Sequence, residues 1–210
     1  MTSETARLRE DICSLARSMF DRGLTHGSTG NISARLADGG LLVTPTGSSF
    51  GRLDPARLSR FDAAGRFVEG DAPTKEMPLH TAFYETSRSG AVVHLHSTHS
   101  VALSMLPETD PDDVLPPLTA YSAMKLGKVK LLPFFVPGDP RMGDSIRELA
   151  GRHPAVLLAH HGPVVAAADL HSAVDAIEEL EATARLALLT HGMNPRRLSA
   201  EQIEAVRSRT

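Results

Sequence analysis

Residues 91–100 read AVVHLHSTHS, and this stretch places three histidines directly after the apolar residues 91–93. The apolar run predicts a buried strand. Because side chains in a strand alternate between two faces, His94 and His96 project together and Leu95 points back to the core. Two neighbouring imidazoles repel when protonated and lose solvation when buried, whereas a metal ion binds both in their neutral form. The motif therefore indicates a metal site, although two ordinary polar residues at a strand end would also fit it.

A second apolar run also ends in histidines. The stretch AVLLAHHGPVV at residues 155–165 places His160 and His161 after a predicted strand and before Gly162. Strands of α/β folds can bring their carboxyl ends together, and a third histidine would complete a three-histidine site with one open coordination position. On the residues alone, either His160 or His161 can supply it. His99 is nearer in sequence, but we expect it to begin a helix that points elsewhere.

The rest of the chain predicts an alternation of helices and short strands. Helices are expected, from periodicity and from the cap at Ser199, at 4–22, in the segment 73–88, and at 99–106, 142–153, 169–189 and 200–209. Strands are expected at 41–44, 58–61, 66–68, 91–97, 128–135, 155–162 and 164–168. Several strands look hairpin-linked. We therefore predict the α/β class with a mixed or antiparallel sheet rather than a doubly wound one.

Length and composition limit the function. The 210 residues, 41% of them apolar, fit one domain with a sizeable core. A net charge of -3 suggests neither a nucleic-acid nor a membrane partner. Cys13 cannot form an internal disulfide, because it is the only cysteine, and it is interpreted as a small buried hydrophobe. No signal-like or membrane-spanning run is seen, so we expect a cytoplasmic protein.

Two loops and one carboxylate add to the histidines. The stretches HGSTGNIS at 26–33 and TPTG at 44–47 are dense in residues that expose backbone N–H groups and hydroxyls, which suits an anion, although plain turns share this composition. Glu76 stands at a helix start in PTKEMPLH. It is either an acid favoured by the helix dipole or, beside a metal, a fourth ligand or general acid/base.

Taken in order, these pieces resemble the class II aldolase family, the zinc-dependent group typified by fuculose-phosphate aldolase. The matching stretches are GSTGNIS, LLVTPTG, PTKEMPLH, AVVHLHSTHS, LTAY and LLAHHGPVVAA, which together with the flanking helices cover nearly the whole chain. The resemblance implies one domain over residues 1–210, with three α/β/α layers and a mainly antiparallel sheet. It also implies a homotetramer with active sites between neighbouring subunits.

The resemblance assigns roles residue by residue. His94, His96 and His161 match the ligands of one zinc ion per subunit, with another divalent metal as the alternative; His161 is chosen because the family ligand directly precedes a glycine. Glu76 matches the acid/base, and Tyr121 resembles a tyrosine that reaches the neighbouring subunit's site. The expected substrate and phosphate positions are Gly30, Asn31, Thr46, Gly47, Thr74 and Lys75.

Lys75 departs from the pattern of sugar-phosphate aldolases, which usually carry small hydroxyl residues before the glutamate. It is either a phosphate clamp or solvated residue, or a cation that meets a substrate carboxylate. With HGP and LTAYSAMKLG, it makes the chain most similar to the branch of 3-oxo-tetronate 4-phosphate decarboxylases.

That branch implies a zinc-dependent lyase that converts a phosphorylated sugar acid to dihydroxyacetone phosphate and carbon dioxide through a metal-stabilised enediolate. A sugar-phosphate aldolase or epimerase is the alternative, since aldol cleavage passes through the same enediolate. A non-catalytic scaffold like the adducin head domain is a third interpretation, and retention of the histidines and Glu76 argues against it.

Overall fold

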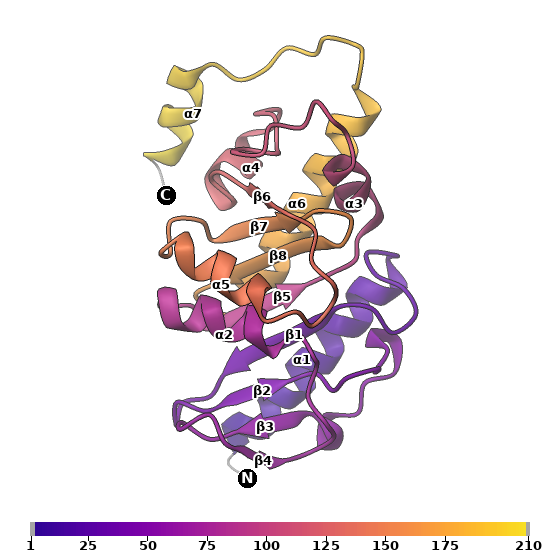
Figure 1. The fold of residues 1–210 in the computed structure, drawn as a ribbon, viewed down its shortest axis with the longest axis vertical. Coiled ribbons are helices and arrows are strands. Elements are labelled where there is room, and N and C mark those ends of the chain that lie inside the picture. Colours follow the sequence, from indigo (N-terminus) through magenta and orange to yellow (C-terminus); the bar gives the residue numbers. More distant parts are fainter. Residues whose placement is uncertain (1–2, 209–210) are drawn as a thin grey trace.

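The histidine-bearing strand lies near the middle of one twisted sheet in the computed structural model, which describes residues 3–208 (Figure 1). Within these residues eight strands pair in the order β4-β3-β2-β1-β5-β8-β7-β6. Their bounds are β1 Asn31–Arg35, β2 Leu41–Val43, β3 Ser59–Phe61, β4 Phe67–Glu69, β5 Ala91–His94, β6 Lys130–Leu132, β7 Ala155–Leu158 and β8 Gly162–Ala167.

The strand directions explain why two histidine motifs meet. All neighbouring strands are antiparallel except β6 and β7. Because β5 and β7 both pair antiparallel with β8, they run in the same direction and end at the same edge of the sheet. Strand β1 is antiparallel to β5, so its first residue, Asn31, lies opposite His94. The predicted mixed, mainly antiparallel sheet is confirmed.

Helices cover both faces of the sheet and give three layers (Figure 1). On one face α2 and α5 pack over Val92, and on the other α1, α3 and α6 pack over Ala91 and Val93. This alternation along β5 divides the apolar core into two parts. The helices are α1 Ser3–Asp21, α2 Met77–Thr86, α3 Thr98–Ser104, α4 Ala120–Lys125, α5 Arg141–Glu148, α6 Leu170–Leu189 and α7 Ala200–Arg207, with short 3₁₀ turns at Phe50–Arg52 and Pro55–Arg57.

Side-chain caps begin two of the helices where they were expected. Asp169 accepts a hydrogen bond from the backbone N–H of Ser172 and starts α6. Ser199 and Gln202 form a reciprocal capping box at α7, which confirms the predicted cap. The predicted helices and strands are all present with shifted ends. The strands predicted at 91–97, 128–135 and 155–162 end earlier, at residues 94, 132 and 158. Residue 209, the predicted end of the last helix, lies outside the described residues.

One strand and one α-helix were not predicted, nor were the two short 3₁₀ turns. Strand β1 lies in a stretch taken as a loop because of its small polar residues, and α4 was not anticipated. In β1, Ile32 and Ala34 face the apolar core while Asn31 and Ser33 face buried polar groups, so all four are buried. The polar half of this alternation concealed the strand.

The remaining global expectations concern Cys13 and the membrane. Cys13 is partly buried against the core rather than fully buried as predicted. Burial, followed by the charge of Glu10, raises the pKa of its thiol to about 11, which agrees with a structural rather than a reactive role. Among residues 3–208, every helix is too short or too polar to cross a bilayer.

Candidate active site

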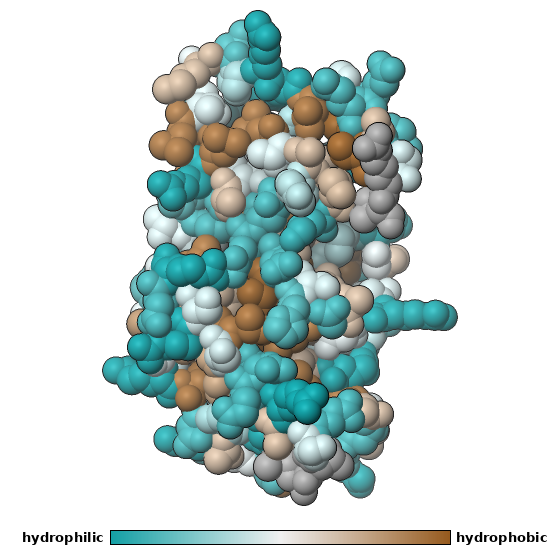
Figure 2. Space-filling view, turned by 180° about the vertical axis from the view of Figure 1, so that it is seen from behind, coloured by the Kyte–Doolittle hydropathy of each residue, from teal (hydrophilic) through white to brown (hydrophobic). Residues whose placement is uncertain are grey.

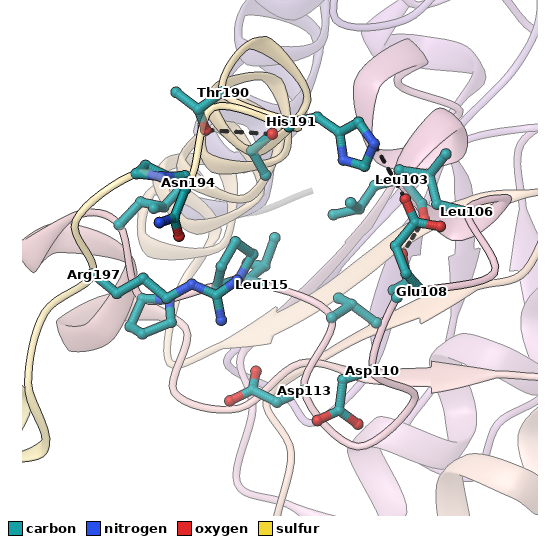
Figure 3. A pocket seen from close by; sticks show the side chains of 18 residues that line it. Leu103, Leu106, Glu108, Asp110, Asp113, Leu115, Thr190, His191, Asn194 and Arg197 are labelled. Carbon is teal, nitrogen blue, oxygen red and sulfur yellow. Dashed lines mark hydrogen bonds and ion pairs between the residues drawn. The ribbon is translucent and has the colours of Figure 1, made fainter.

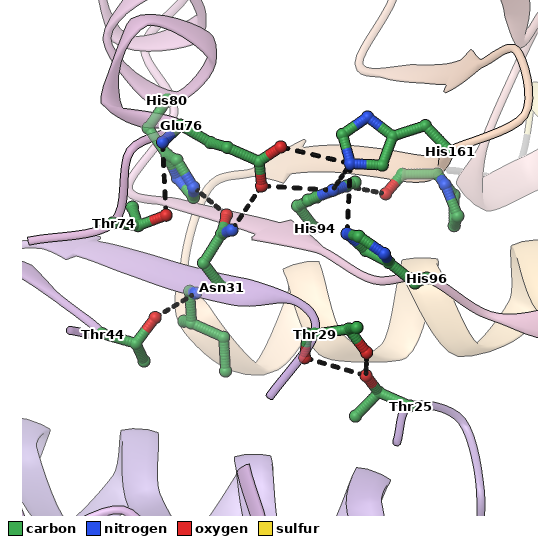
Figure 4. A network of polar contacts seen from close by, with 12 residues as sticks. Thr25, Thr29, Asn31, Thr44, Thr74, Glu76, His80, His94, His96 and His161 are labelled. Atoms are coloured by element: carbon green, nitrogen blue, oxygen red, sulfur yellow. Dashed lines mark hydrogen bonds and ion pairs between the residues drawn. The ribbon is translucent and has the colours of Figure 1, made fainter. Parts of the chain in front are cut away.

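Three imidazoles converge where β5 and β7 end. His94 is the last residue of β5, Leu95 is fully buried in the core, and the ring of His96 lies 4.9 Å from that of His94 between centroids. His161 follows β7 after a short turn. Its Nε2 lies 3.3 Å from Nε2 of His94 and 3.1 Å from Nε2 of His96 (Figure 4). The predicted projection of His94 and His96 to one side is confirmed.

The turn before β8 brings His161 into this cluster. Gly162 has a φ of 153°, and a Cβ atom there would lie 2.0 Å from the carbonyl oxygen of Leu95. Only glycine allows the chain to pass so close to the end of β5. His160, with a φ of 58°, turns outward instead: it is exposed and its ring meets the edge of Phe134. The structure therefore brings His161, and not His160, to His94 and His96.

Glu76 supplies a buried carboxylate beside the three rings. It stands directly before α2 and is 6% exposed. Its Oε1 lies 3.2 Å from Nε2 of His161, and its Oε2 lies 3.4 Å from Nε2 of His94. Asn31, from the facing end of β1, donates a hydrogen bond of 2.6 Å from Nδ2 to Oε2. One ligand atom from each of Glu76 and the three histidines lies within 4.8 Å of the others.

The protonation states of these groups suit a cation. His94 donates from Nδ1 to the carbonyl oxygen of Pro163 at 2.8 Å, which leaves the lone pair of Nε2 facing the cluster. Burial lowers the pKa of His94, and burial with the adjacent His94 and His161 lowers the pKa of His96 to about 3. Burial opposes ionisation of Glu76, but the nearby imidazoles and the Asn31 amide bring its pKa below the ordinary range. These shifts favour the neutral form of His94 and His96 and the anionic form of Glu76, which are the forms that bind a cation.

The geometry fits a tetrahedral metal ion. Nitrogen ligands at about 2.0–2.1 Å from such an ion stand about 3.3–3.4 Å apart, close to the observed Nε2 separations of 3.1 and 3.3 Å. Oε1 of Glu76 is buried and accepts no hydrogen bond from the described residues. A buried carboxylate oxygen without a donor is costly, and a cation at this point would compensate it. His94, His96 and His161 would hold the ion, with Glu76 beside it.

A cavity of about 170 Å³ opens beside the cluster. It brings together the predicted acid/base, one predicted metal ligand and every predicted substrate position. The lining residues are Ser28, Thr29, Gly30, Asn31, Pro45, Thr46, Gly47, Thr74, Lys75, Glu76, His96, Pro137 and Gly138. Gly30 and Gly47 both adopt left-handed backbone, and a Cβ atom on Gly30 would come within 3.0 Å of the carbonyl oxygen of His94. The two predicted anion loops therefore meet at the metal cluster.

Comparison with known proteins agrees with this geometry. The sequence model of one protein family, the class II aldolase and adducin N-terminal domain, matches residues 10–188 of this chain. The chain belongs to this family. A 3-oxo-tetronate 4-phosphate decarboxylase of Escherichia coli K12 is 47% identical over 202 residues, which cover 96% of this chain and 95% of that protein. An L-fuculose phosphate aldolase of Haemophilus influenzae is 30% identical over 204 residues, covering 96% and 92%.

A solved structure confirms the class II aldolase fold. The crystal structure of Escherichia coli YgbL, described as a candidate aldolase, epimerase or decarboxylase, superposes with a TM-score of 0.94 at 45% identity. The match covers 97% of this chain and 99% of that one. The fold predicted from the resemblance is thereby confirmed.

Tyr121 lies outside the cavity of its own chain in this class II aldolase fold. It is on α4, is 62% exposed, and lines a separate hollow with residues of α6 such as Leu186 and Leu189. No residue of the histidine cluster lines that hollow. A role for Tyr121 in catalysis therefore requires a second copy of the chain.

The predictions missed several residues at the site. Pro137 and Gly138 line the cavity from the segment between β6 and α5, and the signal for them was the turn sequence VPGDP. Ser33, His80 and Tyr84 form a buried network behind Glu76. The spacing of four residues between Glu76, His80 and Tyr84 was a visible signal for that network.

A hollow larger than the cavity beside the histidines lies elsewhere. It has a volume of about 570 Å³ and lies between the loop after α3 and the segment after α6 (Figure 3). Among its charged groups, Glu108 already pairs with His191 at 3.3 Å. Among residues 3–208 the group that could hold a metal ion lies at Glu76 and the three histidines and not in this hollow, so size alone does not identify the chemical site.

Proposed function

We propose that this chain is a metal-dependent carboxy-lyase that converts a 3-oxo-tetronate 4-phosphate to dihydroxyacetone phosphate and carbon dioxide. The observation that carries the proposal is the convergence of His94, His96, His161 and Glu76 on one point beside an anion-suited cavity. The name of the relative that is 47% identical supports the substrate. In this proposal the chain is a carbon–carbon lyase. A non-catalytic scaffold would not need the metal cluster, so the cluster favours an enzyme.

The metal in this proposal is zinc. Three imidazole nitrogens and a neighbouring carboxylate are a ligand set that zinc favours in catalytic sites. When bound, it supplies a Lewis acid that withdraws electrons from the substrate ketone. The chain's own task is to hold the three imidazoles with their Nε2 atoms inward, which the His94–Pro163 hydrogen bond does for one of them.

The anion loops would hold the phosphate group. Ser28, Gly30, Thr46 and Gly47 line the cavity. The backbone N–H groups of the two glycines and the hydroxyls of Ser28 and Thr46 form no hydrogen bond with the described residues, so they are free to bind a phosphate. Such groups suit a dianion without full charge neutralisation. Binding the phosphate at this end would leave the rest of the substrate directed at the histidines, which supplies orientation.

Glu76 would hold or move the one proton that the reaction needs. When the bond between the carboxylate carbon and its neighbour breaks, the neighbouring carbon keeps the electron pair and must gain a proton. Asn31 donates to Oε2 of Glu76, whereas Oε1 faces Nε2 of His161 and accepts no hydrogen bond from the described residues. Oε1 is therefore the atom that we assign to proton transfer.

Assembly is part of the proposal. A cavity of 170 Å³ is smaller than the roughly 300–1,000 Å³ of usual ligand sites. Tyr121 projects outward from α4 and is available to complete the site of another copy. We propose a homotetramer in which Tyr121 of one subunit reaches the cavity of its neighbour.

A product assay tests the function. Purified protein loaded with zinc is incubated separately with a 3-oxo-tetronate 4-phosphate, fuculose 1-phosphate and a ribulose phosphate. We expect carbon dioxide and dihydroxyacetone phosphate in equal amounts from the first substrate and little conversion of the others. Aldehyde released from fuculose 1-phosphate, with no decarboxylation of the acid, would assign the chain to the aldolases.

A further inference from the structure

A row of polar side chains runs from Glu76 along one face of α2 into the interior. Glu76, His80 and Tyr84 are spaced by four residues, so they lie on the same side of the helix. Asn31 and Ser33 are two residues apart on β1 and share the face of that strand that looks toward them. His80 lies between these two elements and is completely buried.

Both ring nitrogens of His80 have partners. Nδ1 lies 2.7 Å from Oγ of Ser33, and Nε2 lies 2.5 Å from Oδ1 of Asn31 (Figure 4). The other end of the Asn31 amide donates to Glu76. Oγ of Ser33 lies 2.8 Å from the hydroxyl of Tyr84. The groups therefore form one unbranched chain that ends at the carboxylate.

The direction of each hydrogen bond in this chain of groups can be worked out from its Glu76 end. In the structure Nδ2 of Asn31 faces Oε2 of Glu76 and donates to it, so Oδ1 of the same amide faces His80. A carbonyl oxygen only accepts, so Nε2 of His80 must carry a hydrogen. A neutral imidazole has a single N–H, so Nδ1 accepts from the hydroxyl of Ser33.

The surroundings keep His80 neutral. Burial, followed by the nearby His94, lowers the pKa of His80 to about 3 despite the opposing charge of Glu76. Tyr84 can then donate to the free lone pair of Ser33. Tyr84 thus satisfies Ser33 but does not choose which nitrogen of His80 is protonated.

We propose that His80, fixed as its Nε2–H tautomer, is a positioning residue that locks the Asn31 amide with Nδ2 toward Glu76. In this orientation the Asn31 amide donates to Oε2 of Glu76, and Oε1 is the oxygen that remains available for proton transfer. This inference rests on the role of Glu76 in the proposed function. His80 itself does not line the cavity.

Without the hydrogen bond from Nε2 of His80, nothing in the network fixes which end of the Asn31 amide faces Glu76. Asn31 could then turn its oxygen toward Glu76, where two acceptors repel and the carboxylate is free to rotate. Because a catalytic group must be held near its productive geometry, we expect the chemical step to suffer more than substrate binding.

Two substitutions of the same residue separate positioning from packing. The amide nitrogen of glutamine can lie near the position of imidazole Nε2, whereas the shorter asparagine reaches only the position of Nδ1. We expect His80→Asn to lower kcat by about 10- to 100-fold, as for loss of a buried hydrogen bond to a charged network, with little change in KM. His80→Gln should recover most of that loss.

Tyr84→Phe is the matched control. It removes a hydrogen bond from the same buried network, but on the side away from Glu76. It should lower the melting temperature as His80→Asn does and leave kcat within about twofold, because the Asn31 amide stays locked. Equal losses of kcat in Tyr84→Phe, His80→Asn and His80→Gln would show a packing role only and overturn the proposal.

A substrate-free measurement keeps this inference separate from the proposed function. Long-range ¹⁵N–¹H NMR of the zinc-loaded protein reports which nitrogen of each histidine is protonated. We expect the Nε2–H form for His80, and an Nδ1–H or doubly protonated ring would overturn the proposal. The kinetic comparison uses whichever sugar phosphate the wild type converts. If it converts none, the proposed function fails and the tautomer decides the inference alone.

Discussion

Lys75 is the residue that bears most directly on the choice between a decarboxylase and an aldolase. It precedes Glu76, lines the cavity and is exposed, and it forms no hydrogen bond or ion pair with the described residues. A cation without a partner at the rim of an anion-suited cavity is available to a second anionic group on the substrate. We propose that this group is the carboxylate that is lost.

We predict that Lys75→Met reduces decarboxylation by about 10- to 150-fold, the range for a charge-assisted contact, with zinc content unchanged. Methionine keeps most of the stem and removes the charge. Lys128→Met is the matched control, because Lys128 is also exposed but lies outside the cavity. Steady-state kinetics and metal analysis of both variants provide the measurement.

A phosphate clamp would also weaken substrate binding, so a second ligand is needed. The inhibition constant of an analogue that keeps the phosphate and lacks the carboxylate should be nearly the same for wild type and Lys75→Met. If the substitution weakens the analogue as much as the acid, then Lys75 binds phosphate. The residue-level argument for a decarboxylase would then be lost.

At the level of elements, α3 is held in place by a buried side chain of α6. Glu181 accepts hydrogen bonds from the backbone N–H groups of His99 and Ser100, both at 2.9 Å, and from the hydroxyl of Ser100 at 2.6 Å. Its Oε1 also lies 2.7 Å from Nδ1 of His99. Since α3 begins two residues after His96, this carboxylate anchors the segment that leaves the metal cluster.

We predict that Glu181→Gln lowers the free energy of unfolding by about 1–3 kcal/mol at pH 7, because an amide cannot accept all of these hydrogen bonds. Burial raises the pKa of Glu181, but the hydrogen bonds from Ser100 and His99 lower it by a larger amount. The pKa of Glu181 is therefore below its ordinary value. A lowered carboxyl pKa stabilises the fold above the ordinary glutamate value and loses that effect as the pH falls through the folded value.

The difference between wild type and Glu181→Gln should therefore be full at pH 7 and shrink below about pH 4.3, the ordinary pKa of glutamate. Urea denaturation of both proteins at several pH values measures it. A difference that stays constant down to pH 3 would show that the charge of Glu181 contributes nothing.

The elements also show what the sequence could and could not predict. The strand-end histidines, the α6 helix and the cap at Ser199 followed from local patterns, because periodicity and cap residues act within a few positions. Strand β1 did not, since Asn31 and Ser33 look like loop residues until α2 supplies His80 and Glu76 as partners. The choice of His161 over His160 was made from the family resemblance. Its physical reason, the contact of Gly162 with Leu95, is visible only in the fold.

At the scale of the whole molecule, the outer surface carries exposed apolar side chains of the kind that a second copy of the chain would cover. Figure 2 shows such groups on the upper part of the rear face, the region in which α6 ends. Leu189 and Met193, at and after that end, are 60% and 73% exposed. Together with the exposed Tyr121 on the neighbouring α4, they support the proposed assembly.

We predict that two inactive variants restore activity when mixed. Tyr121→Phe retains its metal site, and His94→Ala retains its tyrosine. After subunit exchange, some mixed interfaces would pair an intact Tyr121 with an intact metal site, so activity should return in part. Exchange is followed by mass spectrometry of differently tagged subunits. No recovery despite complete exchange would place Tyr121 outside the neighbour's site.

The most direct test of a decarboxylase built on this histidine cluster is the release of labelled carbon dioxide from carboxyl-labelled 3-oxo-tetronate 4-phosphate. The wild type is measured beside His161→Asn and His160→Asn, each with its metal content. Asparagine tolerates the left-handed backbone of His160, so that variant is a fair control. We predict that wild type and His160→Asn hold one metal ion per chain and release the label at similar rates, while His161→Asn loses both. Release and metal content that survive in His161→Asn, or a metal-loaded wild type that releases no label, would contradict the account.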